Sequence, residues 1–148
     1  MAQRPHGRAG LQALPEHVRL ARAFARWVDA DPDWERLAPV PFSTVCFRLR
    51  PRGWASDDAR LNPLNERLRE AVNATGAVSL SHAVLPLAPA SPAHRASPEP
   101  GAAESRASRY ALRLAIRQLR TEERDVRQAW EILRAEALRL GATPPLLA

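Results

Sequence analysis

Apolar and polar residues alternate along the segment from Arg109 to Arg117. Apolar side chains at every second position predict a half-buried strand. One face of that strand carries Tyr110, Leu112, Leu114 and Ile116, and the other carries Ala111, Arg113, Ala115 and Arg117.

After Arg120 the period changes from two to that of a helix. We expect Thr121 to be the N-cap, with Glu122 and Glu123 in the first turn, where carboxylates stabilise the positive end of a helix dipole. The apolar stripe of this helix consists of Val126, Trp130, Leu133 and Ala137.

The first part of the chain predicts a helix over Gly10–Ala30 and two strands. Pro15 is tolerated only in a first turn, so we expect the regular helix to begin around Leu14–Glu16. Trp34–Ala38 predicts a short edge strand. Ser43–Arg50 predicts a second strand, on which Val45, Phe47 and Leu49 alternate with Thr44, Cys46, Arg48 and Arg50.

A further helix and strand are expected before a change in composition. Asn62 is expected to cap the helix, with Pro63 at its first position, and Gly76 to end it. Ala77–Leu85 then reads as a strand. Residues 86–108 are rich in Pro, Ala and Ser and keep no apolar period, so we expect a disordered surface loop within one domain.

These elements predict a single α+β domain over residues 1–148. Its sheet is mainly antiparallel, with three to four strands and helices on one face. The strand–helix–strand–strand–helix order of the second half resembles part of a ferredoxin-like split βαβ.

Five segments resemble the C-terminal small domain of the pyridoxal-phosphate-dependent aromatic-L-amino-acid decarboxylase family, an enzyme family of fold type I. The strand–Arg-Thr–helix block ends in the triplet Ala129-Trp130-Glu131. The remaining matches, in the family's order, are Gly10–Gln12 with His17-Val18, Val45–Leu49, Asn62–Val72 and Ser79–His82. The resemblance implies an amino-acid carboxy-lyase that forms a homodimer and has pyridoxal phosphate as cofactor.

In that family the catalytic lysine and the phosphate-binding residues lie in a large domain. All 22 basic residues here are arginine, whose guanidinium stays charged and forms no Schiff base. We therefore expect no catalytic residue, no cofactor bound by this chain alone, and no activity alone. The large domain would be missing or separately encoded, as in a truncated, split or frame-shifted gene.

Arg113 is the candidate substrate-binding residue. The resemblance implies that an arginine at this strand position reaches the substrate carboxylate in glutamate-decarboxylating relatives. Ala111 and Ala115 flank it, so we expect it to be partly covered, and a structural ion pair between domains is the alternative. His82 and Cys46 read as ordinary sheet residues, and no metal-binding motif is present.

Charge and composition limit the other classes. The net charge of +6 comes from arginines scattered over every segment, which favours solvated faces over a nucleic-acid patch. No apolar run approaches a membrane span, and a single cysteine without a secretion signal predicts a cytoplasmic protein.

Two other interpretations of the function remain open. One is a stand-alone ferredoxin-like binding module, which would need a concave site of its own. The other is a small RNA-binding protein, which would need aromatic residues on the central strands for base stacking. Only Tyr110, at the margin of its strand, is available for that purpose.

Overall fold

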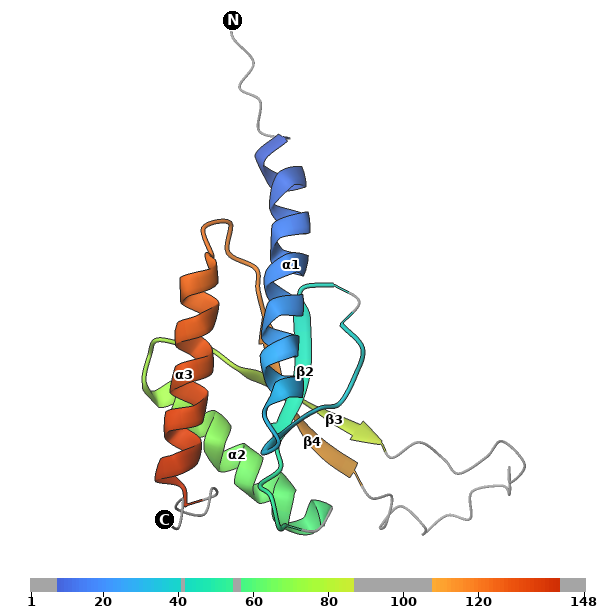
Figure 1. Ribbon diagram of the computed structural model, residues 1–148, viewed down its shortest axis with the longest axis vertical. Helices are drawn as coiled ribbons and strands as arrows, with labels where there is room; N and C mark the ends of the chain where they lie inside the picture. Colours follow the sequence, from blue (N-terminus) through green and yellow to red (C-terminus); the bar gives the residue numbers. More distant parts are fainter. Residues whose placement is uncertain (1–7, 41, 55–56, 87–107, 142–148) are drawn as a thin grey trace, which may run out of the picture.

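The computed structural model describes residues 8–40, 42–54, 57–86 and 108–141, and gives side chains of the first helix from residue 15 onward (Figure 1). The predicted loop over residues 86–108 falls almost wholly outside this part of the chain. The elements are α1 (Arg8–Ala30), β1 (Trp34–Arg36), β2 (Thr44–Leu49), α2 (Asp58–Ala74), β3 (Ser81–Pro86), β4 (Ser108–Ala115) and α3 (Glu123–Arg139).

The four strands form one antiparallel sheet in the order β1-β2-β4-β3. β4 pairs with β2 in the register Phe47–Leu112 and with β3 in the register Ser81–Arg113. Because β2 and β3 are both antiparallel to β4, they run parallel to each other on either side of it. The split βαβ arrangement is therefore confirmed, with β1 as the predicted edge strand.

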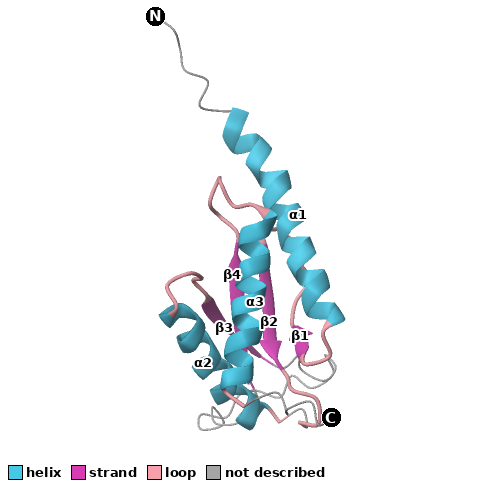
Figure 2. Cartoon of the chain, turned by 60° about the vertical axis from the view of Figure 1, so that its left-hand side comes forward, coloured by secondary structure: helices cyan, strands magenta, loops and turns pink. Residues whose placement is uncertain are grey.

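The helices lie on one face of the sheet, as predicted. Figure 2 shows α3 crossing in front of β2 and β4, with α1 and α2 on either side of it. The opposite face of the sheet carries no helix in the described part of the chain. None of the described helices is both long enough and apolar enough to cross a membrane.

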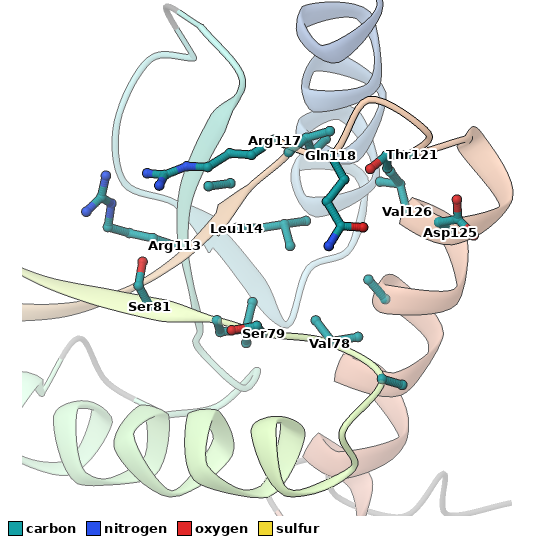
Figure 3. A pocket seen from close by; sticks show the side chains of 15 residues that line it. Val78, Ser79, Ser81, Arg113, Leu114, Arg117, Gln118, Thr121, Asp125 and Val126 are labelled. Carbon is teal, nitrogen blue, oxygen red and sulfur yellow. The ribbon is translucent and has the colours of Figure 1, made fainter.

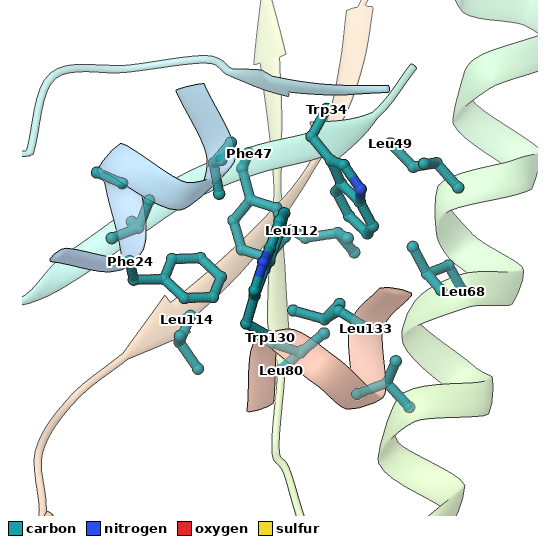
Figure 4. Packing of buried hydrophobic residues seen from close by; sticks show 14 of the residues in the cluster. Phe24, Trp34, Phe47, Leu49, Leu68, Leu80, Leu112, Leu114, Trp130 and Leu133 are labelled. Carbon is teal, nitrogen blue, oxygen red and sulfur yellow. The ribbon is translucent and has the colours of Figure 1, made fainter. Parts of the chain in front are cut away.

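The core lies between the helices and the sheet (Figure 4). The ring of Phe24 from α1 lies 5.1 Å from that of Phe47 and 5.6 Å from that of Trp130, both edge-on. Trp34 lies 5.1 Å from Trp130. The predicted stripe of α3 and the predicted inner faces of β2 and β4 are buried here, which includes Val45, Phe47, Leu49, Leu112, Leu114, Ile116, Val126, Leu133 and Ala137.

The predicted start of α2 is wrong. The helix begins at Asp58, and the carboxylate of Asp57 accepts a hydrogen bond from the backbone N–H of Ala59 at 3.0 Å. Asn62 and Pro63 therefore lie inside the helix. The Asn62 amide does not cap; it bonds the backbone of β4 instead.

The other helix starts also differ from prediction. α3 is capped by Glu122, whose N–H donates to Asp125 Oδ2 at 2.8 Å, one residue after the predicted cap at Thr121. α1 begins at Arg8 and continues through Pro15. A proline inside a helix removes one hydrogen bond. The long helix retains its other bonds and the packing of its later turns.

Candidate functional site

Arg113 lies on the face of β4 that points away from the helices, between Cys46 of β2 and Ser81 of β3. Its side chain is half-buried, in agreement with the expectation of partial cover. Arg113 makes no hydrogen bond or ion pair with the residues that the structure describes. A partly covered guanidinium without an acceptor is suited to bind an anion supplied from elsewhere.

Two more arginines share this face. Arg109 and Arg117 lie four residues before and after Arg113, with Ala111 and Ala115 between them. The Nε atom of Arg109 is buried and has no hydrogen-bond partner. We name Arg109, Arg113 and Arg117 the arginine stripe; its members share the helix-free face with the small side chains of Ala111 and Ala115.

A cavity of about 560 Å³ opens beside the stripe, where β3 and β4 separate (Figure 3). Its walls are residues 77–81, which lead into β3, residues 113–118 at the end of β4, and the first turns of α3. The size lies within the range of ordinary ligand pockets, roughly 300–1,000 Å³.

The cavity exists because β3 starts later than predicted. Pairing with β4 ends at Ser81–Arg113, although the alternation predicts a strand from Ala77. Asn73 of α2 holds the backbone of Leu80 from the other side, accepting from its N–H at 2.7 Å and donating to its carbonyl at 3.0 Å. The Leu80 side chain is also buried in the core, so residues 77–80 follow α2 rather than β4.

Hydrogen-bond donors dominate the polar wall of the cavity. Figure 3 shows Arg113 and Arg117 extending to one side of the sheet, while the Gln118 side chain extends into the opening. Ser79, Ser81 and Thr121 add hydroxyl groups. Asp125 is the carboxylate among the lining residues, and it accepts the N–H of Glu122. This wall fits an anionic ligand.

A buried arginine, Arg48, was missed by the sequence analysis. Only 1% of it is exposed, and its guanidinium contacts Glu35 Oε2 at 2.9 Å and Asp58 Oδ1 at 2.6 Å. Alternation placed Arg48 on the face of its strand opposite to Val45, Phe47 and Leu49 and predicted nothing of its burial. Its register opposite Glu35 across β1 and β2 was the one available signal. This ion-pair network joins the sheet to the start of α2.

The two histidines in the described part of the chain, His17 and His82, lie outside the stripe. His82 is exposed and stacks on Tyr110, with ring centroids 4.9 Å apart. His17, which the sequence analysis named only as part of a matching segment, is buried, and its Nε2 donates to the Gln118 carbonyl at 2.9 Å. Cys46 is a half-buried free thiol. Among the described residues no group of acidic, histidine and cysteine side chains is arranged to hold a metal.

Comparison with known proteins finds enzymes that are similar to nearly the whole of this chain. The chain is 32% identical over 145 residues to tyrosine decarboxylase 1 of Narcissus pseudonarcissus, which covers 95% of the chain and 24% of that enzyme. It is 33% identical over 141 residues to tryptophan decarboxylase 2 of Oryza sativa, again 95% of the chain and 24% of the enzyme. The chain thus spans about a quarter of the length of these relatives. No family model matches it.

Solved structures agree. Catharanthus roseus tryptophan decarboxylase in complex with L-tryptophan superposes with a TM-score of 0.65 at 28% identity, over 87% of this chain and 22% of that one. Oryza sativa TDC with pyridoxal phosphate gives 0.67 at 26%, over 87% and 23%. Mouse CSAD, at 14% identity and a TM-score of 0.62 over 84% of this chain and 24% of that one, shares the fold.

Proposed function

The chain belongs to the aromatic amino-acid decarboxylase family, and on that premise we propose that it acts as the small carboxy-terminal domain of a pyridoxal-phosphate-dependent carboxy-lyase. One observation carries the proposal: similarity to these enzymes extends over nearly the whole chain but only a quarter of theirs. The partner is then a large cofactor-binding domain, and the assembly is a homodimer, as the family resemblance implies. We place the protein in the cytoplasm, where the free thiol of Cys46 would persist.

The residues of this chain do not fit the cofactor by themselves. Pyridoxal phosphate is held covalently through a lysine amine, and the chain has 22 arginines and no lysine. Arg113 and Arg117 could bind an anion but cannot replace that amine. The cofactor must therefore be held by residues outside this chain, which is inactive without them.

For Arg113 we propose contact with the carboxylate of the substrate. The residue is half-buried, unpaired within the described chain, and beside a cavity wall rich in donors. An ion pair with the large domain is the structural alternative. If Arg113 contacts the substrate, its substitution should raise KM. If Arg113 instead forms an ion pair with the large domain, its substitution should lower the stability of the assembly of the two domains.

A stand-alone binding module is the second candidate, because the structure provides the concave site that this reading needs. The RNA-binding reading is not supported. Tyr110 is held on the helix side by Arg69, whose Nε donates to its hydroxyl at 2.6 Å. The described helix-free face presents arginine and alanine where base stacking would need aromatic rings.

The experiment is to determine the native form of the protein. The coding DNA upstream of Met1 should be translated in all frames, and the native polypeptide captured from its cells with an antibody for mass measurement. We expect a lysine-bearing cofactor domain, in the same polypeptide or in a co-purifying one. A native 148-residue chain without such a partner would support the stand-alone module instead.

A further inference from the structure

The cavity wall formed by β4 is an unused strand edge. The N–H of Ile116 donates to the Ser43 carbonyl at 2.9 Å, so the peptide groups of Ile116 face β2. Successive residues of a strand direct these groups to opposite sides. The N–H and carbonyl groups of Ala115, the last residue of β4, therefore face the cavity, and the same alternation continued past the end of the strand directs those of Arg117 there. β3 pairs with neither residue, since its pairing with β4 ends at Ser81.

The side chains around this edge separate into two layers. Towards the helices the cavity is lined by Val78, Val126 and Ala129, which are apolar. Towards the helix-free face it is bordered by Arg113 and Arg117, which have no ion pair among the described residues. A strand placed along the edge would direct alternate side chains into an apolar layer and a cationic layer.

We propose that the cavity is a strand-addition site for an extended acidic segment of a partner protein. The segment continues the sheet beside Ala115 and Arg117 in the space that residues 77–80 vacate. Its apolar side chains lie on Val78 and Ala129, and its carboxylates lie beside Arg117. Main-chain hydrogen bonds supply affinity in this mode of recognition, and alternate side chains supply specificity.

Register follows from the same geometry. Opposed residues of an antiparallel pair point to the same face, so residues facing Ala115 and Arg117 have their side chains on the cationic side. The acidic residues of the segment therefore also donate and accept the main-chain hydrogen bonds to β4. Strand addition at this edge goes beyond the proposed decarboxylase role and does not depend on it.

The probe is the blocked tetrapeptide acetyl-Val-Glu-Val-Glu-amide, titrated into the full isotope-labelled chain and followed by backbone amide resonances. We expect shifts centred on Ala115, Arg117 and Ser79. Arg117→Gln should weaken binding about tenfold, because a charge-assisted hydrogen bond is lost. Arg67→Gln, an equal loss of charge on the exposed side of α2, should leave binding unchanged.

Two further probes separate strand addition from simple attraction of anions. The same peptide with N-methyl groups on both glutamates keeps its charge but cannot donate to β4, so it should not bind. The Val-Lys-Val-Lys peptide should not bind either. Equal binding of the N-methylated peptide, equal shifts with free glutamate or inorganic phosphate, or an unchanged affinity of Arg117→Gln would overturn the proposal.

Discussion

Asn73 and Leu80 are joined by a pair of hydrogen bonds between the Asn73 side-chain amide and the Leu80 backbone, at 2.7 and 3.0 Å. This pair covers the outer edge of the chain just before β3 and draws residues 77–80 away from β4. The shape of the cavity thus depends on one side chain of α2.

Asn73→Ala should destabilise the domain by about 1–3 kcal/mol, since a partly buried backbone N–H and carbonyl of Leu80 lose their partners. Urea unfolding measures this change. Gln128→Ala, at an exposed position of α3, is the matched control and should fall within about 0.5 kcal/mol of the parent. Equal stability of the two variants would mean that Asn73 does not hold residues 77–80 in place before β3.

Arg48→Ala should cost about 3 kcal/mol or more, because Glu35 and Asp58 would keep their charges without the buried partner. Arg36→Ala removes an ion pair with Asp29 at 3.1 Å that is largely exposed, and should cost less than about 1 kcal/mol. Chemical denaturation of both variants gives the comparison. A similar small loss for both would show that the Arg48 network contributes little.

Phe24→Ala should cost about 3–5 kcal/mol, because the ring is fully buried against Phe47 and Trp130. Phe42→Ala removes the same group at a position that is 75% exposed, and thermal unfolding should show little change. If Phe24→Ala had the same melting temperature as the parent protein, α1 would not be part of the core in solution.

The hydrogen bond from Arg19 lowers the pKa of Glu16 below its ordinary value. The interaction is therefore complete above the ordinary pKa of a glutamate and is lost as the pH falls through the lowered one. Side-chain carboxyl NMR should give a midpoint below that of a free glutamate. Arg19→Gln should raise this midpoint towards the ordinary value, and an unchanged midpoint would rule out the contact.

Local pattern was enough to predict the core faces. Val45, Phe47 and Leu49 alternate on β2, and the stripe around Trp130 on α3 is also read directly from spacing. Both depend only on side-chain period. The position of Arg113 between Ala111 and Ala115 on the other face of β4 followed from the same rule.

The features that the sequence pattern did not predict depend on side chains that bond residues outside their own helix or strand. Asn62 has the features of an N-cap, yet its amide bonds the Ser108 carbonyl and the Tyr110 N–H, and Asp57 caps the helix instead. The burial of Arg48 depends on two acids from other elements. The cavity depends on Asn73, seven residues from its partner in sequence. The loop prediction and the roles of Arg113 remain predictions.

The most direct test of the decarboxylase role is a chimera in which this chain replaces the matching quarter of Oryza sativa tryptophan decarboxylase. Decarboxylation should be measured beside cofactor binding and oligomeric state. We expect an active enzyme in which Arg113→Met raises KM about tenfold or more, while Arg120→Met, outside the cavity lining, leaves KM unchanged. A folded chimera that binds pyridoxal phosphate but does not decarboxylate would contradict the account.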